Sequence, residues 1–460
     1  MNFVPFVAFL FFVSFVAAQT GKAFIPHTEA LPIVQALRDD LIPSELKNRA
    51  AADLEGAWPA WISGRDAAVR ARVAEGDEDS IAYLVLFGTT FTAKPRTTER
   101  ELAALAVNSA DGMKAVQPRI ADFVAAVALP DANERLQFAR QVFARHAIDL
   151  TTDAGRTQVR RFLEERVAGV ATGAIPRSAT LLDRGAAAAD TQTLFRDRGL
   201  SSDTSIFIDY GIDQALAQLK LQGRLDTAAV RRVAIIGPGL DFTDKLEGYD
   251  FYPQQTIQPF AIVDSLMRHD LAAPDLQVTA FDLSPRVIQH LDAARERARR
   301  SEPYTLVLPR NLDRPWTPEL VDYWQRIGGW IGEEAKAPAA PPNAGRVQIR
   351  SVRVRPAVTA AITPRDLNIV LERSEAASPA DRFDLVIATN ILLYYDVFEQ
   401  ALATANIARM LRPGGLLLTN NQIFELPPIP LGGVGFTDVT YMALPGIGET
   451  GDRVVWYQRQ

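Results

Sequence analysis

Two short stretches of the chain each join an apolar run to a residue type that binds small molecules. In the first, Val233–Ile236 leads into Gly237 and Gly239. In the second, Leu276–Phe281 leads into Asp282. Four apolar residues followed by glycine predict a buried parallel strand that ends in a tight turn, where the missing Cβ lets a small molecule approach the backbone. An acid at the tip of the next strand is placed to accept hydrogen bonds from two ribose hydroxyls, so we expect a ribose-containing ligand here.

A third apolar run, Phe383–Ala388, precedes a predicted helix and then Arg412–Thr419, which contains Pro-Gly-Gly-Leu. The order of these four stretches resembles that of the class I S-adenosylmethionine-dependent methyltransferases, over roughly residues 225–460. The resemblance implies an α/β fold: a Rossmann-like methyltransferase domain with a mainly parallel sheet and an antiparallel C-terminal hairpin. It also implies S-adenosylmethionine as the cofactor and methyl transfer, to an oxygen or a nitrogen of an unidentified acceptor, as the reaction.

The resemblance further implies which residues contact the cofactor. By position in the pattern they are Gly237, Gly239, Asp241, Asp282, Asp366, Leu367 and Asn390. Asp366 and Leu367 match the Asp-Leu pair that meets the adenine amino group in the family. Ile235 stands where the family usually has an acid, and Asp241 or Asp244, just past the turn, could supply the missing carboxylate. The alternative role for Asp282 is to cap the helix that follows it.

The stretch after the third run shows a narrower likeness. Residues 383–396 look like the Asn-x-Leu-Ile-Tyr-Phe-Asp region of the chemotaxis-receptor glutamate methyltransferases. That likeness implies Asn390, Tyr394 and Tyr395 as catalytic residues at the methyl-donor end of the cofactor. Thr389 replaces the arginine usual in those enzymes, which argues against glutamate as the substrate. A carboxylate acceptor would need no general base, whereas a hydroxyl or an amine can need one, and the two tyrosines or the aspartate that follows them lie nearest.

The composition of the chain argues against several other kinds of function. The chain has 460 residues, enough for two or three domains, and its net charge of −6 disfavours a general nucleic-acid binder. The absence of cysteine excludes disulfides, thiolate metal sites and cysteine nucleophiles. The 4 histidines are far apart in sequence and show no metal-binding spacing, so no metal is expected.

The N-terminus predicts export or anchoring. Residues 2–16 are apolar and rich in phenylalanine, and Ala17 and Ala18 offer small residues for cleavage. Residues 1–18 therefore resemble a secretory signal peptide, although no lysine or arginine precedes the apolar run. The alternatives are an uncleaved membrane anchor and a cytoplasmic protein with a mispredicted start. Export conflicts with S-adenosylmethionine being a cytosolic cofactor.

The first half of the chain reads as a helical domain over residues 22–200, followed by the methyltransferase-like domain over 201–460. Apolar residues at spacings of three and four predict separate helices at 64–75 and 77–87, with Pro59 in a loop. The helix at 206–221 is expected to be capped by Ser201, Ser202 or Asp203, and the alternative is that this segment folds over the cofactor. Residues 299–345 form an insertion expected at the sheet edge away from the cofactor.

Two other readings remain open. The rival to an enzyme is a non-catalytic binding protein of the same fold, exported or anchored, which Ile235 and the N-terminus favour. An NAD(P)-dependent oxidoreductase is disfavoured, because Phe242 stands where its third glycine would be and no catalytic Tyr-x-x-x-Lys pair is evident. The stretches 434–443 and 453–459 also match the reversed terminal strand pair of methyltransferases better than a plain NAD-binding fold.

Overall fold

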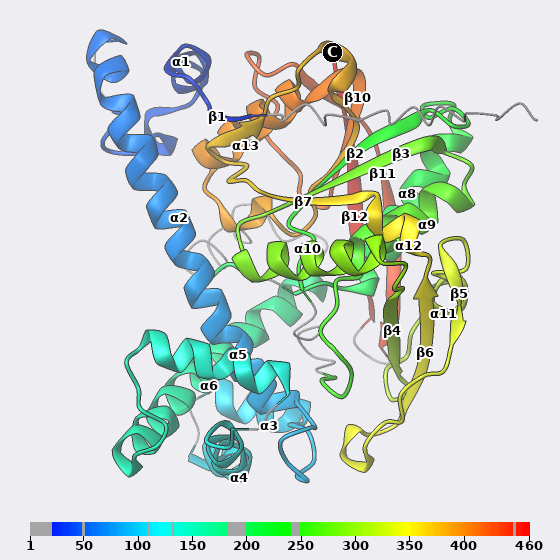
Figure 1. Ribbon diagram of the computed structural model, residues 1–460. Coiled ribbons are helices and arrows are strands. Elements are labelled where there is room, and N and C mark those ends of the chain that lie inside the picture. Colours follow the sequence, from blue (N-terminus) through cyan, green and yellow to red (C-terminus); the bar gives the residue numbers. More distant parts are fainter. Residues whose placement is uncertain are drawn as a thin grey trace, which may run out of the picture.

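The computed structural model describes residues 21–47, 51–107, 110–130, 133–182, 199–201, 203–240, 249–444 and 448–460 (Figure 1). The helices are α1 (His27–Ala36), α2 (Ala51–Phe87), α3 (Glu99–Ala106), α4 (Ala110–Val127), α5 (Glu134–Arg145), α6 (Asp153–Leu182), α8 (Ile206–Leu221), α9 (Gln258–Arg268), α10 (Pro285–Arg299), α11 (Pro318–Arg326), α12 (Pro356–Ala360) and α13 (Val397–Met410). The strands are β1 (Lys22–Phe24), β2 (Val230–Ile236), β3 (Ala272–Asp282), β4 (Tyr304–Asn311), β5 (Gly332–Ala335), β6 (Val347–Val354), β7 (Ile362–Asp366), β8 (Glu372–Ser374), β9 (Phe383–Ile387), β10 (Leu411–Thr419), β11 (Leu431–Leu444) and β12 (Gly448–Arg459).

A sheet of seven strands forms the centre of the molecule, in the order β11-β12-β10-β9-β2-β3-β7. Neighbouring strands from β10 to β7 run parallel. The last strand, β12, lies between β10 and β11 and is antiparallel to both. The prediction of a mainly parallel sheet with a reversed C-terminal hairpin is therefore confirmed.

Both faces of this sheet are covered, which explains why its strands are apolar at successive positions. On β2, Val233 and Ile235 lie in one buried cluster with α8 and α9. The alternate residues Ala234 and Ile236 lie in a second cluster with α1, the first half of α2 and α13. Ile235 is 0% exposed, so the position at which a carboxylate would be expected belongs to the core.

Helix α2 is continuous over 37 residues, so the prediction of two helices and a loop at Pro59 was wrong. An internal proline costs a helix about 3 kcal/mol. Packing offsets that cost here: Trp58 is buried, its Nε1–H donates to the carbonyl of Ile25 at 3.0 Å, and its ring stacks on Trp61 with centroids 5.0 Å apart. Local sequence signals for a break are overridden by contacts with the sheet domain.

The second half of α2 packs with α3–α6 around a separate buried core that includes Phe123 and Phe143. In Figure 1, α2 runs diagonally from the neighbourhood of α1 down to this group of helices, which lies below the sheet. The helical character predicted for this half is thus seen, while α1 and the start of α2 contribute to the core of the sheet domain.

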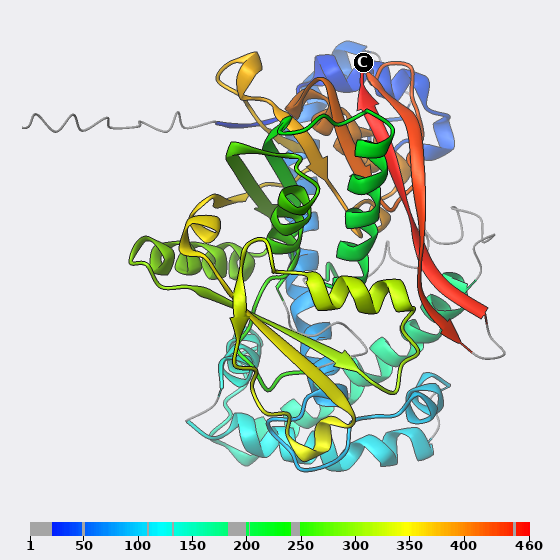
Figure 2. The same ribbon diagram turned by 90° about the vertical axis from the view of Figure 1, so that its right-hand side faces the viewer.

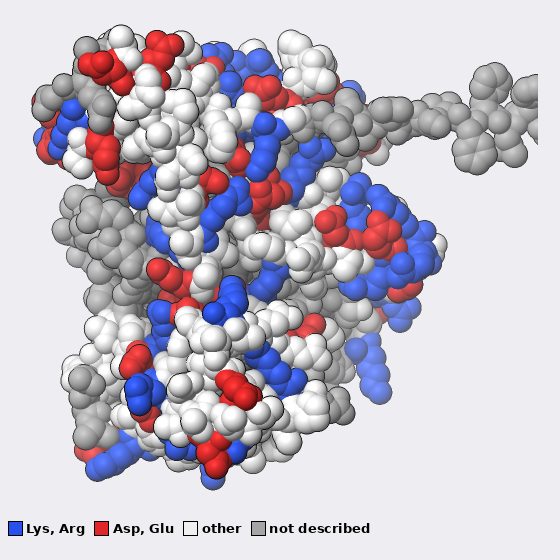
Figure 3. Space-filling model, turned by 60° about the vertical axis from the view of Figure 1, so that its left-hand side comes forward, with Lys and Arg blue, Asp and Glu red and all other residues white. Residues whose placement is uncertain are grey.

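On the face shown in Figure 3, basic and acidic side chains are interspersed.

The insertion between α10 and β7 forms its own three-stranded sheet, β4-β6-β5, with α11 beside it. It extends past the predicted end, because β6 finishes at Val354. It also contacts the C-terminal hairpin: Trp316 bridges to Met442, and the Thr317 N–H donates to the Tyr441 carbonyl at 2.9 Å. Figure 2 shows the long red hairpin extending beyond the sheet toward the yellow-green insertion.

The predicted leader, residues 1–18, lies outside the described residues. Within the described ranges, no helix is both long enough and apolar enough to cross a membrane. In the same ranges, no group of three or more histidine, aspartate or glutamate side chains is arranged to hold a metal ion.

Candidate functional site

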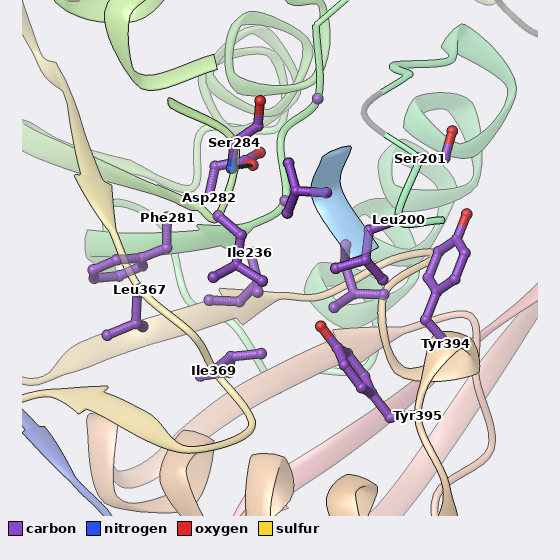
Figure 4. A pocket seen from close by; sticks show the side chains of 15 residues that line it. Leu200, Ser201, Ile236, Phe281, Asp282, Ser284, Leu367, Ile369, Tyr394 and Tyr395 are labelled. Atoms are coloured by element: carbon purple, nitrogen blue, oxygen red, sulfur yellow. Dashed lines mark hydrogen bonds between the residues drawn. The ribbon is translucent and has the colours of Figure 1, made fainter. Parts of the chain in front are cut away.

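A cavity lies where the carboxyl ends of β2, β3, β7 and β9 meet, the edge at which open α/β sheets bind ligands. Six of the predicted residues line it: Gly237, Gly239, Asp282, Leu367, Tyr394 and Tyr395. Figure 4 shows Asp282 on one side of the cavity and the two tyrosines on the opposite side. Its volume of about 50 Å³ holds a few water molecules, and the cavity is partly open to solvent.

The glycine turn after β2 adopts a conformation that favours glycine. Gly237 and Gly239 have φ values of +68° and +72°, in the left-handed region. A Cβ on Gly237 would overlap the side chain of Ile391. The Gly237 N–H donates to the Phe281 carbonyl at 2.7 Å, which ties the turn to β3. The glycines therefore allow β2, β3 and the loop after β9 to meet at the cavity.

Asp282 lines the cavity and also holds the turn that leads into α10, whose N-cap residue is Ser284. Its Oδ1 accepts a hydrogen bond from the Ser284 N–H at 2.8 Å, at the start of α10. Its carboxyl group also lines the cavity. Burial raises the pKa of Asp282 to about 6, against the opposing effect of N–H groups from Ser284, Gly239 and Leu283. Its carboxylate can still accept hydrogen bonds from a ligand at neutral pH.

Tyr394 and Tyr395 lie on the loop between β9 and α13, and α2 holds this loop in place. Arg72 Nη1 donates to the Tyr394 carbonyl at 3.0 Å, and the Arg72 guanidinium carbon lies 5.8 Å from the centre of the Tyr395 ring. Burial raises the pKa of the Tyr395 hydroxyl above its usual value. The Tyr395 hydroxyl therefore stays protonated at neutral pH and can donate a hydrogen bond, but it is poorly suited to accept a proton.

Leu200 and Ser201 also line the cavity, together with Val73 of α2. The helix cap predicted at Ser201, Ser202 or Asp203 was wrong: Ser205 caps α8, its Oγ accepting from the Phe207 N–H at 3.3 Å. The alternative, a segment folded over the site, describes the structure better.

A glycine on α2 makes this cover possible. The Leu200 N–H donates to the Arg72 carbonyl at 2.8 Å. A Cβ on Gly76 would overlap the Leu200 backbone carbonyl, and a Cβ on Gly199 would overlap the backbone of Gly76. A glycine inside a helical pattern, such as Gly76, is therefore the signal in the sequence that could have indicated a close backbone approach.

Asn390 lies outside the cavity lining and is exposed. It has a positive φ of 57°. Its N–H donates to Asn420 Oδ1 at 2.8 Å, and Asn420 Nδ2 donates back to Asn390 Oδ1 at 2.7 Å. The structure thus places Asn390 with the end of β10, apart from the tyrosines with which the sequence grouped it.

Asp366 is not among the residues that line the cavity, whereas Leu367 is. The Asp366 carboxylate accepts from Lys22 Nζ at 2.8 Å and from Arg70 Nη1 at 2.7 Å. Burial alone would raise the pKa of Asp366, but the hydrogen bonds from Arg70 and Lys22 outweigh it and the pKa is lowered. Lys22 and Arg70 therefore bind the carboxylate that the sequence predicted to contact the adenine amino group. The remaining predicted residue, Asp241, lies outside the described residues.

Comparisons with known proteins give only distant matches. No family model matches the chain, and no curated protein matches it. Three similar solved structures are the N-methyltransferase NodS from Bradyrhizobium japonicum with S-adenosyl-L-homocysteine, the magnesium protoporphyrin IX methyltransferase ChlM from Synechocystis with S-adenosylmethionine, and an O-methyltransferase family protein from Burkholderia thailandensis.

The three likenesses are weak by every measure. Their sequence identities to this chain are 13%, 11% and 12%, and their TM-scores are 0.25, 0.26 and 0.25. The matches cover 59%, 63% and 90% of this chain, and 98%, 97% and 98% of the other chains. Values this low do not bear on what this chain binds. None of the three is described as a chemotaxis-receptor enzyme.

Proposed function

We propose that this protein is a methyltransferase that uses S-adenosylmethionine. The observation that supports the proposal is the convergence of Gly237, Gly239 and Asp282 on one cavity at the carboxyl edge of the sheet. That sheet ends in a reversed strand pair, which resembles the methyltransferase pattern and distinguishes it from a plain dinucleotide-binding sheet.

The residues at the cavity fit the nucleoside half of this cofactor. The Asp282 carboxylate is placed to accept hydrogen bonds from ribose hydroxyls, and Leu367 and Ile369 offer apolar surface for a flat base. When bound, the cofactor would supply a methyl group already activated on a sulfonium. The chain's own contribution is then to align the acceptor and to exclude water, for which Leu200 and Tyr395 are placed on the far side of the cavity.

Calorimetric titration of the purified chain with S-adenosylmethionine and S-adenosylhomocysteine tests this proposal. NAD is titrated as a competitor, to test for a dinucleotide site. We expect micromolar binding that Asp282→Ala weakens at least tenfold, about 1.4 kcal/mol. The matched control is Asp275→Ala, on the same strand, whose exposed carboxylate pairs with Arg231 at 3.0 Å. Absence of heat and of any thermal shift at millimolar cofactor would remove the enzyme proposal.

A second candidate, a non-catalytic binding protein of this fold, is supported by Ile235. This side chain is fully buried where the family has an acid, so the amino end of the cofactor has no carboxylate from that position. The two candidates separate in one experiment. Cofactor binding accompanied by S-adenosylhomocysteine release with any of a panel of hydroxyl, amine and carboxylate acceptors supports the enzyme, and tight binding without turnover supports the binding protein.

A further inference from the structure

A carboxyl group that the proposed cofactor site does not use is buried in the first turn of α8. Asp209 is 1% exposed, and neither of its carboxyl oxygens has a hydrogen-bond partner among the described residues. Burial holds the pKa of Asp209 well above its usual value, although the neighbouring Gln258 side chain acts in the opposite direction. A buried polar group without a partner costs free energy, so Asp209 lacks a donor that a ligand or water would supply.

A second carboxyl group lies on the C-terminal hairpin. Asp452 Oδ2 accepts a hydrogen bond from the Tyr441 hydroxyl at 3.0 Å. Burial raises the pKa of Asp452, against the effects of the Tyr441 and Asn420 side chains. In the ranges that the structure describes, neither Asp209 nor Asp452 forms an ion pair with a lysine or arginine.

The two acids lie at the same end of the sheet. Val455 pairs with Thr419, the last residue of β10, so Asp452 extends beyond the carboxyl end of that strand. Helix α8 packs on the hairpin here: the Tyr441 hydroxyl is 3.5 Å from the position that a Cβ on Gly211 would take. Burial raises the pKa of Tyr441, and the nearby carboxyl groups of Asp452 and Asp209 add to the effect, which places Asp209 close to that hydroxyl.

The loop after β9 separates these acids from the cavity. On the cavity side it presents Tyr394 and Tyr395. On the other side, Gln258 Nε2 donates to Thr389 Oγ1 at 2.9 Å, and Gln258 is the neighbour of Asp209. Asn390, which follows Thr389, is bonded to Asn420 as described above. The acids therefore lie just across this loop from the proposed methyl-donor end.

Aromatic rings surround this region and carry unpartnered polar atoms of their own. The Phe207 ring lies 5.3 Å from Trp316 and 5.5 Å from Tyr441, and the Tyr210 ring lies 5.4 Å from Tyr323, centroid to centroid. Among the described residues, the buried Tyr323 hydroxyl and the buried Trp316 Nε1–H have no hydrogen-bond partner. Tyr323 lies close to Asp209, since that carboxyl group contributes, after burial, to raising the pKa of the Tyr323 hydroxyl.

We propose that Asp209, Tyr441 and Asp452 form the acceptor site, and that the acceptor is a small aromatic compound with a hydroxyl or amino group. The proposal rests on the methyltransferase function proposed above. The acceptor's O–H or N–H is the hydrogen-bond donor that the acids lack, and the Asp452 carboxylate receives its proton. A carboxylate acceptor is disfavoured, because it would place a third acid beside two carboxyl groups without an ion-pair partner in the described part of the chain.

Equilibrium dialysis of the full chain tests the site with three matched probes, para-nitrophenol, para-nitroaniline and para-nitrobenzoate, at a pH at which the phenol keeps its proton and the benzoate is ionised. We expect the phenol or the aniline to bind at least tenfold more tightly than the benzoate. Which of the two binds better identifies oxygen or nitrogen as the preferred acceptor atom. Absence of binding by both at millimolar concentration, or equal binding of the benzoate, would overturn the proposal.

Variants make the test specific to the acids. Asp452→Asn should reduce the tenfold discrimination against the benzoate to less than threefold, because it removes a carboxylate that repels the benzoate. The control is Asp438→Asn on the same hairpin, where the carboxylate pairs with Arg453 at 2.8 Å. Tyr441→Phe is a further variant, which removes the hydroxyl that donates to Asp452 and retains the ring. An equal effect of Asp438→Asn would show that the acids do not line the site.

The same samples separate this proposal from the function on which it rests. Titration with S-adenosylhomocysteine reports on the cofactor site, and Asp452→Asn should leave that affinity unchanged. If the cofactor fails to bind while the phenol binds in an Asp452-dependent manner, the methyltransferase function is wrong and the aromatic site stands. If the cofactor binds and neither the phenol nor the aniline does, the acceptor site is wrong and the cofactor site stands.

Discussion

Asp282 and Asp366 occupy equivalent places on neighbouring strands and have opposite surroundings. Their Cα atoms are partners in the register of β3 and β7, at the same edge of the sheet. The Asp282 carboxyl accepts a backbone N–H and lines the cavity, and burial raises its pKa to about 6. The Asp366 carboxylate is 43% exposed and paired with Lys22 and Arg70, which lower its pKa.

The difference shows that position on a strand does not decide whether an acid is free to bind a ligand. The N–H groups that bind the Asp282 carboxyl are close to it, since Ser284 follows it in sequence and Gly239 lies on the turn after the neighbouring strand. The groups that occupy Asp366 come from β1 and α2, about 300 residues earlier in the chain.

The largest loss of stability is expected from a change that disturbs the segment at Leu200 and Ser201, which lines the same cavity as Asp282 and covers it. Gly76→Ala places a Cβ against the Leu200 carbonyl, and because the obstacle is backbone, we expect a loss of about 2 to 3 kcal/mol in unfolding free energy. The pKa of Asp282 should fall toward its usual value as the cover loosens, while that of Asp366 should stay. Urea unfolding and carboxyl titration by NMR measure the two effects.

The matched control for the cover is Gly64→Ala on the same helix. No atom lies within 4 Å of the position of its added Cβ, so helix propensity alone should stabilise the protein by about 0.5 to 1 kcal/mol. Equal changes in stability for the two variants would show that Leu200 does not depend on the space at Gly76.

The second effect concerns the charge of Asp282. Its pKa in the folded state, about 6, lies above the usual 3.8, so the folded state binds more protons between these values and stability falls as the pH rises through that range. Asp282→Asn removes this loss and should stabilise the protein at pH 8 by about 3 kcal/mol relative to the original chain. Below about pH 4 the advantage should disappear. Urea unfolding at both pH values checks it, and an advantage that does not change with pH would contradict it.

The contrast also explains how far the sequence could predict the molecule. The strands β2, β3 and β9 were predictable because both faces of the sheet are covered, and Gly237, Gly239 and Asp282 followed from their strand ends. The break predicted within α2 was wrong, because Trp58 donates to the distant Ile25 carbonyl and stacks on Trp61. The cap predicted before α8 was wrong, because the chain at Leu200 is still bonded to α2 and the cap comes later, at Ser205.

The acids outside the cofactor pattern were invisible to sequence reasoning for a related reason. Asp209 looks like any first-turn helical acid, and Asp452 looks like a hairpin residue. Only the fold shows that one is buried and that both lie beyond the same loop. Neither has a motif spacing, because residues from α8, α9 and β12 meet there.

The third effect is on ligand affinity. Asp282→Ala should weaken binding of S-adenosylhomocysteine at least tenfold, whereas Asp366→Ala should weaken it less than threefold, since the Asp366 carboxylate already has cationic partners and lies outside the cavity lining. Calorimetry under one buffer condition compares the two variants directly. A tenfold loss for Asp366→Ala would mean that the ion pairs exchange for an adenine contact when the ligand binds.

The smallest effect is on the ion pairs of Asp366. Its lowered pKa contributes stability above the usual value of 3.8, and that contribution is lost as the pH falls through the folded pKa. Because the group is 43% exposed, Asp366→Asn should cost less than about 1 kcal/mol at pH 7, and the cost should shrink in high salt. Arg70 and Lys22 retain Glu372 as a partner in that variant, with its carboxylate 2.9 Å from Lys22 Nζ, which limits the loss further. Urea unfolding at low and high ionic strength measures the difference, and a cost that is large and independent of salt would place Asp366 with Asp282 as a buried group rather than in contrast to it.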